Sequence, residues 1–140
     1  MGPDARPHRC AVREVRVHSS RREQMLDVTD QVGDAVRESG VMDGICLVYT
    51  PHTTCAVTVN EGYDPAVQAD ALRHLGKLVP READFEHSEG NSDSHIKAIC
   101  VGPSVALPVA GSELRLGHWQ SIFLCEFDGP RDRQLWVLVK

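Results

Sequence analysis

The alternation of hydrophobic and polar residues predicts short strands in the first half of the chain. Apolar and charged residues alternate unevenly from Cys10 to His18, and a second apolar run covers Gln24 to Thr29. Such runs are typical of strands, and the polar segment Ser19–Arg22 between them is consistent with a hairpin. Two runs rich in β-branched residues, Ile45–Thr50 and Thr54–Asn60, predict buried strands joined at a corner.

A change to helical spacing interrupts these strands. Apolar positions within residues 30–39 predict a helix with Asp30 as its cap and Gly40 as its end. Asp64 followed by Pro65 predicts the start of a second helix, which runs to about Leu78. A third, short helix is expected from Ser92 or Asp93 through Cys100, after a polar and acidic loop over 80–92.

The last third of the chain returns to strands. They are expected over Ser104–Val109, Leu114–Leu116, Ser121–Phe127 and Gln134–Val139, with turns between them. We therefore predict an α+β fold: a single domain of mostly antiparallel β-sheet with two or three inserted helices. Residues 1–9 are expected to be a flexible N-terminal arm, and residues 10–140 to form the domain.

Composition and charge exclude several classes of protein. Hydrophobic residues make up 41% of the 140 residues and charged residues 25%, which excludes collagenous, coiled-coil and largely disordered chains. The formal charge of -5 opposes binding to a phosphate backbone, so nucleic acid is not an expected partner. No apolar run approaches the ~18 residues that span a bilayer, and a secretory signal is not expected. A cytoplasmic protein without a membrane partner is expected.

The five cysteines predict buried, reduced thiols rather than a disulfide framework. Their number is odd, they are widely scattered, and no Cys-x-x-Cys pair occurs. Cys55 follows His52 by three residues, which raises the alternative of a cysteine nucleophile. Because Cys55 lies within a predicted buried strand, a small buried hydrophobe is the favoured interpretation.

Three of the seven histidines stand apart by their location. His52 lies at the corner between two predicted strands, and His87 and His95 bracket the acidic loop. Neutral imidazole is a common ligand of zinc, nickel and iron, and neighbouring acids such as Glu89 can orient the rings. The spacing of eight residues between His87 and His95 matches no standard zinc motif, so surface ion pairs remain the alternative.

Four motifs closely resemble the YjbQ-like family, also called the secondary thiamine-phosphate synthase family. They are PHTTCAVTVNEGYDP at 51–65, FEHSEGNSDSHIKA at 85–98, GPSVALPV at 102–109 and LGHWQSIFLCEFDGPR at 116–131. Their order and spacing agree with the family over about Val12 to Val139. The sequence departs from the family at Cys55, where alanine is usual, and at His118, where threonine is usual. His118 adds a further nitrogen near the predicted site.

The resemblance implies a homotrimer with a histidine-rich metal site. The family's motif histidines fall on His52, His87 and His95, which we therefore predict to hold a divalent metal, with zinc preferred. The predicted catalytic residues are Glu89, Glu61 and Lys97. The predicted substrate-binding residues are Asn60, Asn91, Ser104 and Gln120.

The activity implied by the resemblance is weak thiamine-phosphate synthesis, which joins a pyrimidine diphosphate to a thiazole phosphate with loss of pyrophosphate. Its physiological reaction is left open by the sequence, as is the question of whether this is an enzyme at all. The first alternative is a non-catalytic trimeric protein that binds a metal or a small ligand. The second is a trimeric structural module with incidental activity. A small phosphorylated heterocycle is the expected partner under the enzymatic hypothesis.

Overall fold

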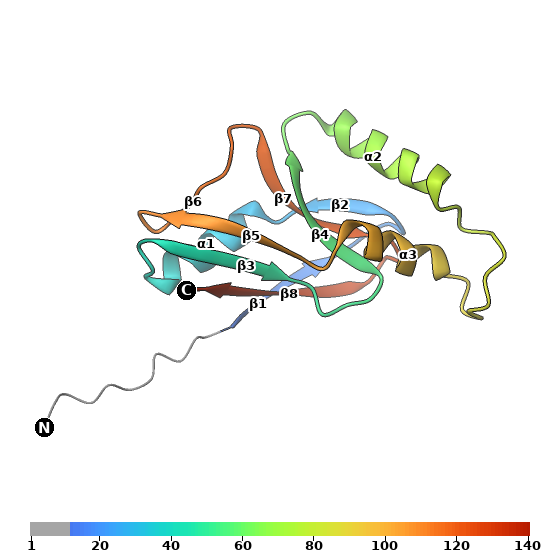
Figure 1. The fold of residues 1–140 in the computed structure, drawn as a ribbon, viewed down its shortest axis with the longest axis horizontal. Coiled ribbons are helices and arrows are strands. Elements are labelled where there is room, and N and C mark those ends of the chain that lie inside the picture. The colour runs from blue at the N-terminus through green and yellow to red at the C-terminus, as the bar shows by residue number, and fades with distance from the viewer. Residues whose placement is uncertain (1–11) are drawn as a thin grey trace, which may run out of the picture.

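The computed structural model describes residues 12–140, which form two antiparallel sheets and three helices (Figure 1). The larger sheet has five strands in the order β1-β8-β3-β5-β6. The smaller sheet has three strands in the order β2-β7-β4. The strands of the larger sheet are β1 (Arg13–His18), β8 (Asp132–Val139), β3 (Gly44–Tyr49), β5 (Ser104–Ala110) and β6 (Glu113–Leu114). Those of the smaller sheet are β2 (Gln24–Asp27), β7 (Gln120–Glu126) and β4 (Cys55–Glu61).

The main core lies between the two sheets and includes one face of helix α1 (Thr29–Ser39). Alternate residues of β4 point into it, so Cys55 and Val57 are buried there beside Val32 and Val36 of the helix. Because side chains of a strand alternate between its faces, the intervening residues of β4 point to the other side of the smaller sheet.

Helices α2 (Pro65–Leu78) and α3 (Ser92–Val101) lie on that other face of the smaller sheet (Figure 1). A second apolar cluster forms there around Phe123, Cys125 and Phe127. The two helices pack unequally: α3 buries four of its residues, whereas α2 buries none. Helix α3 therefore packs tightly on the smaller sheet, whereas α2 packs on it loosely.

The structure confirms the α+β class, with a single domain of antiparallel sheets and three helices. It also confirms the second helix, since the Asp64 side chain accepts a hydrogen bond from the amide of Ala66 at 2.9 Å. The predicted arm, residues 1–9, lies outside the described residues. None of the helices within residues 12–140 combines the length and the apolar character that a bilayer crossing requires.

Two local predictions are wrong. The first two strands do not form a hairpin, because β1 pairs with β8 and β2 pairs with β7 in the other sheet. Asp30 does not cap α1, which begins one residue earlier at Thr29. Instead, the Asp27 carboxylate accepts hydrogen bonds from the amide and the hydroxyl of Thr29. Gly40 ends the helix as predicted, in the left-handed conformation with φ of 70°.

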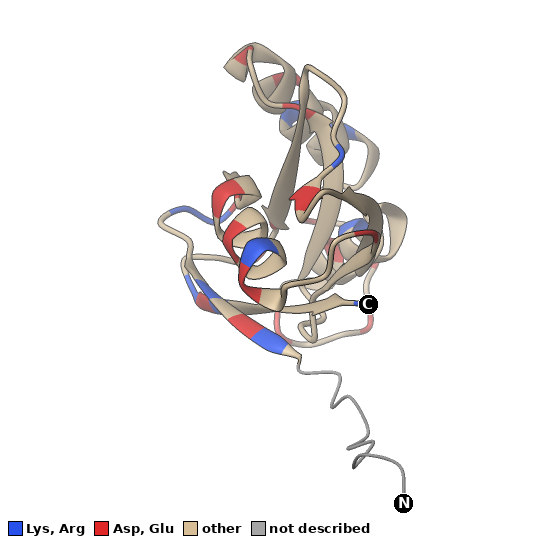
Figure 2. Cartoon of the chain, turned by 90° about the vertical axis from the view of Figure 1, so that its left-hand side faces the viewer, with Lys and Arg blue, Asp and Glu red and all other residues tan. Residues whose placement is uncertain are grey.

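Charges of both signs are interspersed along β1 and over α1 (Figure 2). In β1 the basic residues Arg13 and Arg16 alternate with Glu14. On α1, Arg37 pairs with Asp34 at 2.6 Å. This face of the molecule therefore presents a mixed rather than a uniformly basic surface.

Candidate functional site

Two of the three predicted metal ligands, His87 and His95, lie side by side. His95 is in the first turn of α3, and His87 is in the segment that connects α2 to it. Their ring centroids are 5.4 Å apart, and the ring planes meet at 86°. The rings line an open cleft of about 470 Å³. The other residues that line it are Asp84, Phe85, Glu86, Ser92 and Ile96.

The distance between these rings fits two ligands of one metal ion. Two imidazoles that bind a tetrahedral zinc ion at ~2.0 Å through nitrogen have centroids roughly 5 Å apart. The 5.4 Å separation of His87 and His95 is close to that value. In addition, Glu89 Oε2 lies 3.6 Å from His87 Nε2, where a carboxylate can orient the ring. These residues therefore suit a divalent ion by donor type and by spacing.

His52 lies elsewhere in the chain's fold, at the corner between β3 and β4. Its Nε2 accepts a hydrogen bond from the backbone amide of Gln134 at 3.0 Å. It lines a separate hollow with Arg16 and His18 of β1 and Asp132 of β8. Burial lowers the pKa of His52, and the nearby Arg133 lowers it further, so the neutral ring is favoured.

The three histidines do not form one group within a single chain. Among the described residues, no three His, Cys, Asp or Glu side chains gather in an arrangement that suits an ion. The nitrogen of His52 that accepts the Gln134 amide is occupied, and the other nitrogen of a neutral ring carries the proton. A role for His52 as a metal ligand therefore requires a change in this hydrogen bond.

The predicted catalytic residue Lys97 is buried inside an ionic cluster. Its side chain is 2% exposed, and its ammonium donates hydrogen bonds to Glu23 at 2.5 Å and Asp93 at 2.9 Å. Arg22 also donates to Asp93, at 3.0 and 3.2 Å. Burial opposes the ionised form of Asp93, but these hydrogen bonds outweigh it and keep its pKa below its ordinary value. Lys97 thus fixes α3 to the β1–β2 connection, and proton transfer by it would require its release from two carboxylates.

Asn91 supports the same helix from its start. It is the residue before α3, and its Nδ2 donates a hydrogen bond to Asp128 at 2.8 Å. Its buried Oδ1 has no hydrogen-bond partner among residues 12–140. Asn91 therefore joins α3 to the loop after β7.

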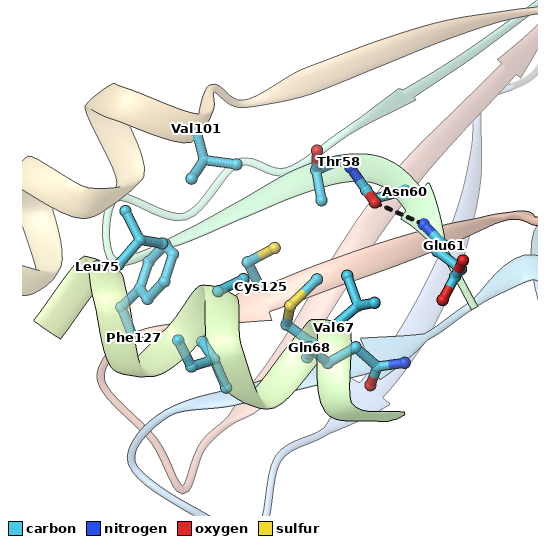
Figure 3. Close-up of a pocket in the computed structure, with 12 residues that line it drawn as sticks. Thr58, Asn60, Glu61, Val67, Gln68, Leu75, Val101, Cys125 and Phe127 are labelled. Atoms are coloured by element: carbon cyan, nitrogen blue, oxygen red, sulfur yellow. Dashed lines mark hydrogen bonds between the residues drawn. The ribbon is translucent and has the colours of Figure 1, made fainter. Parts of the chain in front are cut away.

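The remaining predicted site residues lie at two other places. Glu61 and Gln120 face each other across β4 and β7, and Asn60 lies next to them. Asn60 and Glu61 line a pocket under α2 together with Gln68 (Figure 3). Ser104 is exposed at the start of β5, where it pairs with Tyr49. The structure thus does not bring these residues to the histidine pair within one chain.

The thiol predictions are confirmed for most of the described cysteines. Cys46, Cys55 and Cys125 are buried and free, whereas Cys100 is free and exposed; Cys10 lies outside the described residues. Burial raises the pKa of Cys55, which opposes a thiolate nucleophile beside His52.

Sequence reasoning missed Arg133, which forms the central ion pair of the fold. Its guanidinium bonds to Glu126, at 2.5 Å from Nη2 to Oε2, and to the Thr54 hydroxyl at 2.8 Å. Ser19 donates a further hydrogen bond to Glu126 at 2.6 Å. The pair joins the larger sheet to the smaller one directly behind the His52 corner. The alternation of side chains along β8 could have indicated that Arg133 is buried, because Arg133 lies on the same inward face as Leu135.

Comparison with known sequences identifies relatives over nearly the whole chain. The sequence model of the family described as "UPF0047 protein YjbQ-like" matches residues 13–140. A UPF0047 protein of Methanocaldococcus jannaschii is 43% identical over 123 residues, which is 88% of this chain and 89% of the relative. The UPF0047 protein YugU of Bacillus subtilis is 39% identical over 127 residues, or 90% of this chain and 96% of the relative.

Solved structures agree with this assignment. The crystal structure of an uncharacterised YjbQ/UPF0047 family protein from Clostridium acetobutylicum is 45% identical, with a TM-score of 0.91. The match covers 92% of this chain and 100% of the Clostridium acetobutylicum chain. A conserved hypothetical protein from Thermus thermophilus is 39% identical with a TM-score of 0.86, and the match covers 92% and 100% of the two chains. The protein therefore belongs to the YjbQ-like (UPF0047) family.

Proposed function

We propose that this protein binds a divalent metal ion, with zinc preferred, in a site built on His87 and His95. The observation that carries the proposal is the 5.4 Å separation of the two rings, which suits two nitrogens on one ion. Both rings face an open cleft, so a substrate or a further ligand has access to the ion. Asp93 and Lys97 fix the helix that carries His95 and so hold one ligand in place.

The proposed third ligand is His52 of a neighbouring subunit in a homotrimer. Within one chain His52 does not join the pair, but a closed ring of identical chains places two different surfaces of each chain in contact. The corner that carries His52 would be one surface and the start of α3 the other. On binding, His52 would exchange its bond from the Gln134 amide for the ion.

Exposed apolar side chains support an assembly of this kind. Tyr63 is 78% exposed and stacks edge-on against Trp119, with ring centroids 5.2 Å apart. His118 in turn packs against Trp119 at 4.8 Å. Ile99 on the outer side of α3 is 80% exposed. The contiguous exposed group of Tyr63, Trp119 and His118 is of the kind that contacts other subunits.

The proposed activity is a weak thiamine-phosphate synthase-type transfer. The thiazole nitrogen attacks the methylene carbon of the pyrimidine diphosphate, a carbon–nitrogen bond forms, and the carbon–oxygen bond to the diphosphate breaks to release pyrophosphate. A bound divalent ion supplies positive charge for such a leaving group. Of the chain's own residues, Glu89 lies beside His87 as an orienting carboxylate. The transfer releases no proton, so it requires no proton acceptor.

The dispersion of the other polar residues favours a second candidate, a non-catalytic trimeric protein that binds a metal or a small ligand. Lys97 is enclosed by carboxylates, and Glu61 lies at the pocket under α2 rather than beside the histidines. A single active site would bring such residues together. The two candidates predict different results for the metal-loaded protein: the enzyme forms product from its substrates, and the non-catalytic protein does not.

Titration with zinc tests the metal site. Metal-free protein should bind about one equivalent per chain, as expected for one site in each subunit. His87→Ala and His95→Ala should each lose that binding while they remain folded. His74→Ala, on the exposed side of α2, is the matched control and should bind as the unchanged protein does. Full zinc binding by both folded variants would refute the site.

Mixing of subunits tests whether His52 comes from a neighbour. His52→Ala and His95→Ala trimers should each bind little zinc alone. After joint refolding at equal amounts, about one quarter of the sites would combine an intact His52 with an intact His95 on the adjacent chain. Recovery to about that fraction supports a shared site, and no recovery refutes it.

A coupled assay for thiamine phosphate tests the transfer. Slow product formation by zinc-loaded protein, reduced in Glu89→Gln without loss of zinc, would support an orienting role of this carboxylate. Glu82→Gln, in the same acidic segment but outside the cleft, is the control. No product above background would favour the non-catalytic candidate.

A further inference from the structure

A pocket of about 200 Å³ lies between α2 and the outer face of the smaller sheet (Figure 3). Its floor includes Met25 of β2 and Cys125 of β7, and its roof is the face of α2 that carries Ala71 and Leu72. Val101, at the last turn of α3, closes one side. Val101 lies six residues after His95 on α3, so at a rise of ~1.5 Å per residue the pocket begins about 9 Å along the helix from His95.

The pocket forms because α2 does not pack closely against the smaller sheet. None of its 14 residues is buried, although Leu72 and Leu75 on its inner face are apolar. By contrast, the adjacent helix α3 buries Ala98 against the same sheet. The inner face of α2 is therefore only partly used by packing, and the space beneath it remains open to a ligand.

The two ends of the pocket differ in chemistry. Leu75 and Phe127 form an apolar end, whereas Asn60, Glu61 and Gln68 gather at the other end (Figure 3). No lysine or arginine lines the pocket. Within residues 12–140, the Glu61 carboxylate is in no ion pair, and the hydrogen bond that Glu61 forms with the Asn60 side chain comes from its backbone amide. One end of this apolar pocket thus carries a carboxylate that has no cation partner among the described residues.

We propose that this pocket binds a small organic cation that has a six-membered ring or a similar apolar body. A dry cavity of ~150 Å³ lined by apolar side chains accommodates benzene, so the 200 Å³ here suits one ring with a short substituent. The ring would lie between Leu75 and Phe127, and an amidinium or ammonium group would face Glu61. This site is independent of the proposed metal site.

Binding of benzamidine, observed by NMR on labelled full-length protein, tests the proposal. Backbone signals of α2 and β4 should shift with saturation, and signals of His87 and His95 should not. Benzoate has a similar ring with the opposite charge and should cause no such shifts. Benzyl alcohol, a neutral analogue, should bind the same residues more weakly.

Three variants make the test specific. Glu61→Gln should weaken benzamidine binding about fivefold and change benzyl alcohol binding less than about twofold, since only the charge is removed. Ala71→Trp should fill the pocket and abolish both, whereas His74→Trp adds the same bulk to the exposed side of α2 and should leave both unchanged.

Three results would overturn the proposal. The first is benzamidine binding outside α2 and β4, and the second is equal benzamidine affinity in Glu61→Gln. The third is occupation of the pocket by a second copy of the chain. In that case, folded Ala71→Trp would lower the mass measured by light scattering, and unchanged protein would not bind benzamidine.

Discussion

Helices α2 and α3 cover the same face of the same sheet but are held there in different ways. In α3, Asp93 and Lys97 are buried and paired with each other and with the β1–β2 connection. In α2, the comparable pair of Asp70 and Arg73 is exposed, and no residue of the helix is buried. The difference indicates that α3 is a rigid support for His95, whereas α2 is the looser wall of a pocket.

Removal of the acidic residue from each helix should give the largest difference in stability between α3 and α2. Asp93→Ala leaves the buried Lys97 and its neighbour Arg22 with too little negative charge, so we expect a loss of about 3–5 kcal/mol in the free energy of unfolding. Asp70→Ala removes only a solvent-exposed ion pair, and a change below about 0.5 kcal/mol is expected. Urea denaturation measures both. Equal losses in the two variants would contradict the difference between the helices.

A second prediction concerns the buried Glu126, the acid that pairs with Arg133. Burial opposes its ionised form, but the bonds from Arg133 and Ser19 outweigh burial and hold its pKa below the ordinary 4.5. Its contribution to stability is therefore fully present above about pH 4.5 and is lost as the pH falls through the lowered pKa.

Urea midpoints measured from pH 6 to pH 2.5 test this prediction. The decline with acid should be shallower in Glu126→Gln than in the unchanged protein, because the variant has no carboxylate to protonate. Glu113→Gln, at a glutamate that is 59% exposed and pairs with Arg37, should keep the original profile. A Glu126→Gln profile parallel to that of the unchanged protein would contradict the assignment.

The smallest expected effect is a difference in reaction rate between two thiols, one exposed on α3 and one buried beneath α2. Cys100 is exposed on α3 and should react quickly with a thiol reagent in the native protein. Cys125 lies beneath α2, where burial and the nearby Cys55 raise its pKa to about 12, so it should react slowly. Cys100→Ser should remove one fast-reacting thiol, and Cys125→Ser should remove none. Fast reaction at Cys125 would mean that α2 opens more widely than the structure indicates.

The same two helices illustrate how much the sequence could predict. The start of α2 followed from Asp64 and Pro65, because a capping carboxylate and a fixed φ act locally. The looseness of α2 did not follow, since Leu72 and Leu75 have the spacing of a buried face whether or not the sheet comes close enough to bury them.

Contacts between distant segments were the least predictable part. The β1–β2 connection does not form a hairpin, because the partners of each strand lie more than 90 residues further along the chain. The sequence groups His52 with His87 and His95, but the structure places only His87 and His95 side by side, because His52 lies at the corner between the two sheets. The sequence predicts Lys97 as a catalytic residue but does not reveal that Glu23 and Asp93 both accept hydrogen bonds from its ammonium.

The most direct test of the metal site is a crystal structure of the zinc-loaded protein with anomalous diffraction recorded at the zinc absorption edge. The proposal predicts one strong anomalous peak per chain between the rings of His87 and His95, with His52 of an adjacent subunit as a third ligand. A peak that touches neither His87 nor His95, or no peak at full zinc loading in solution, would contradict it.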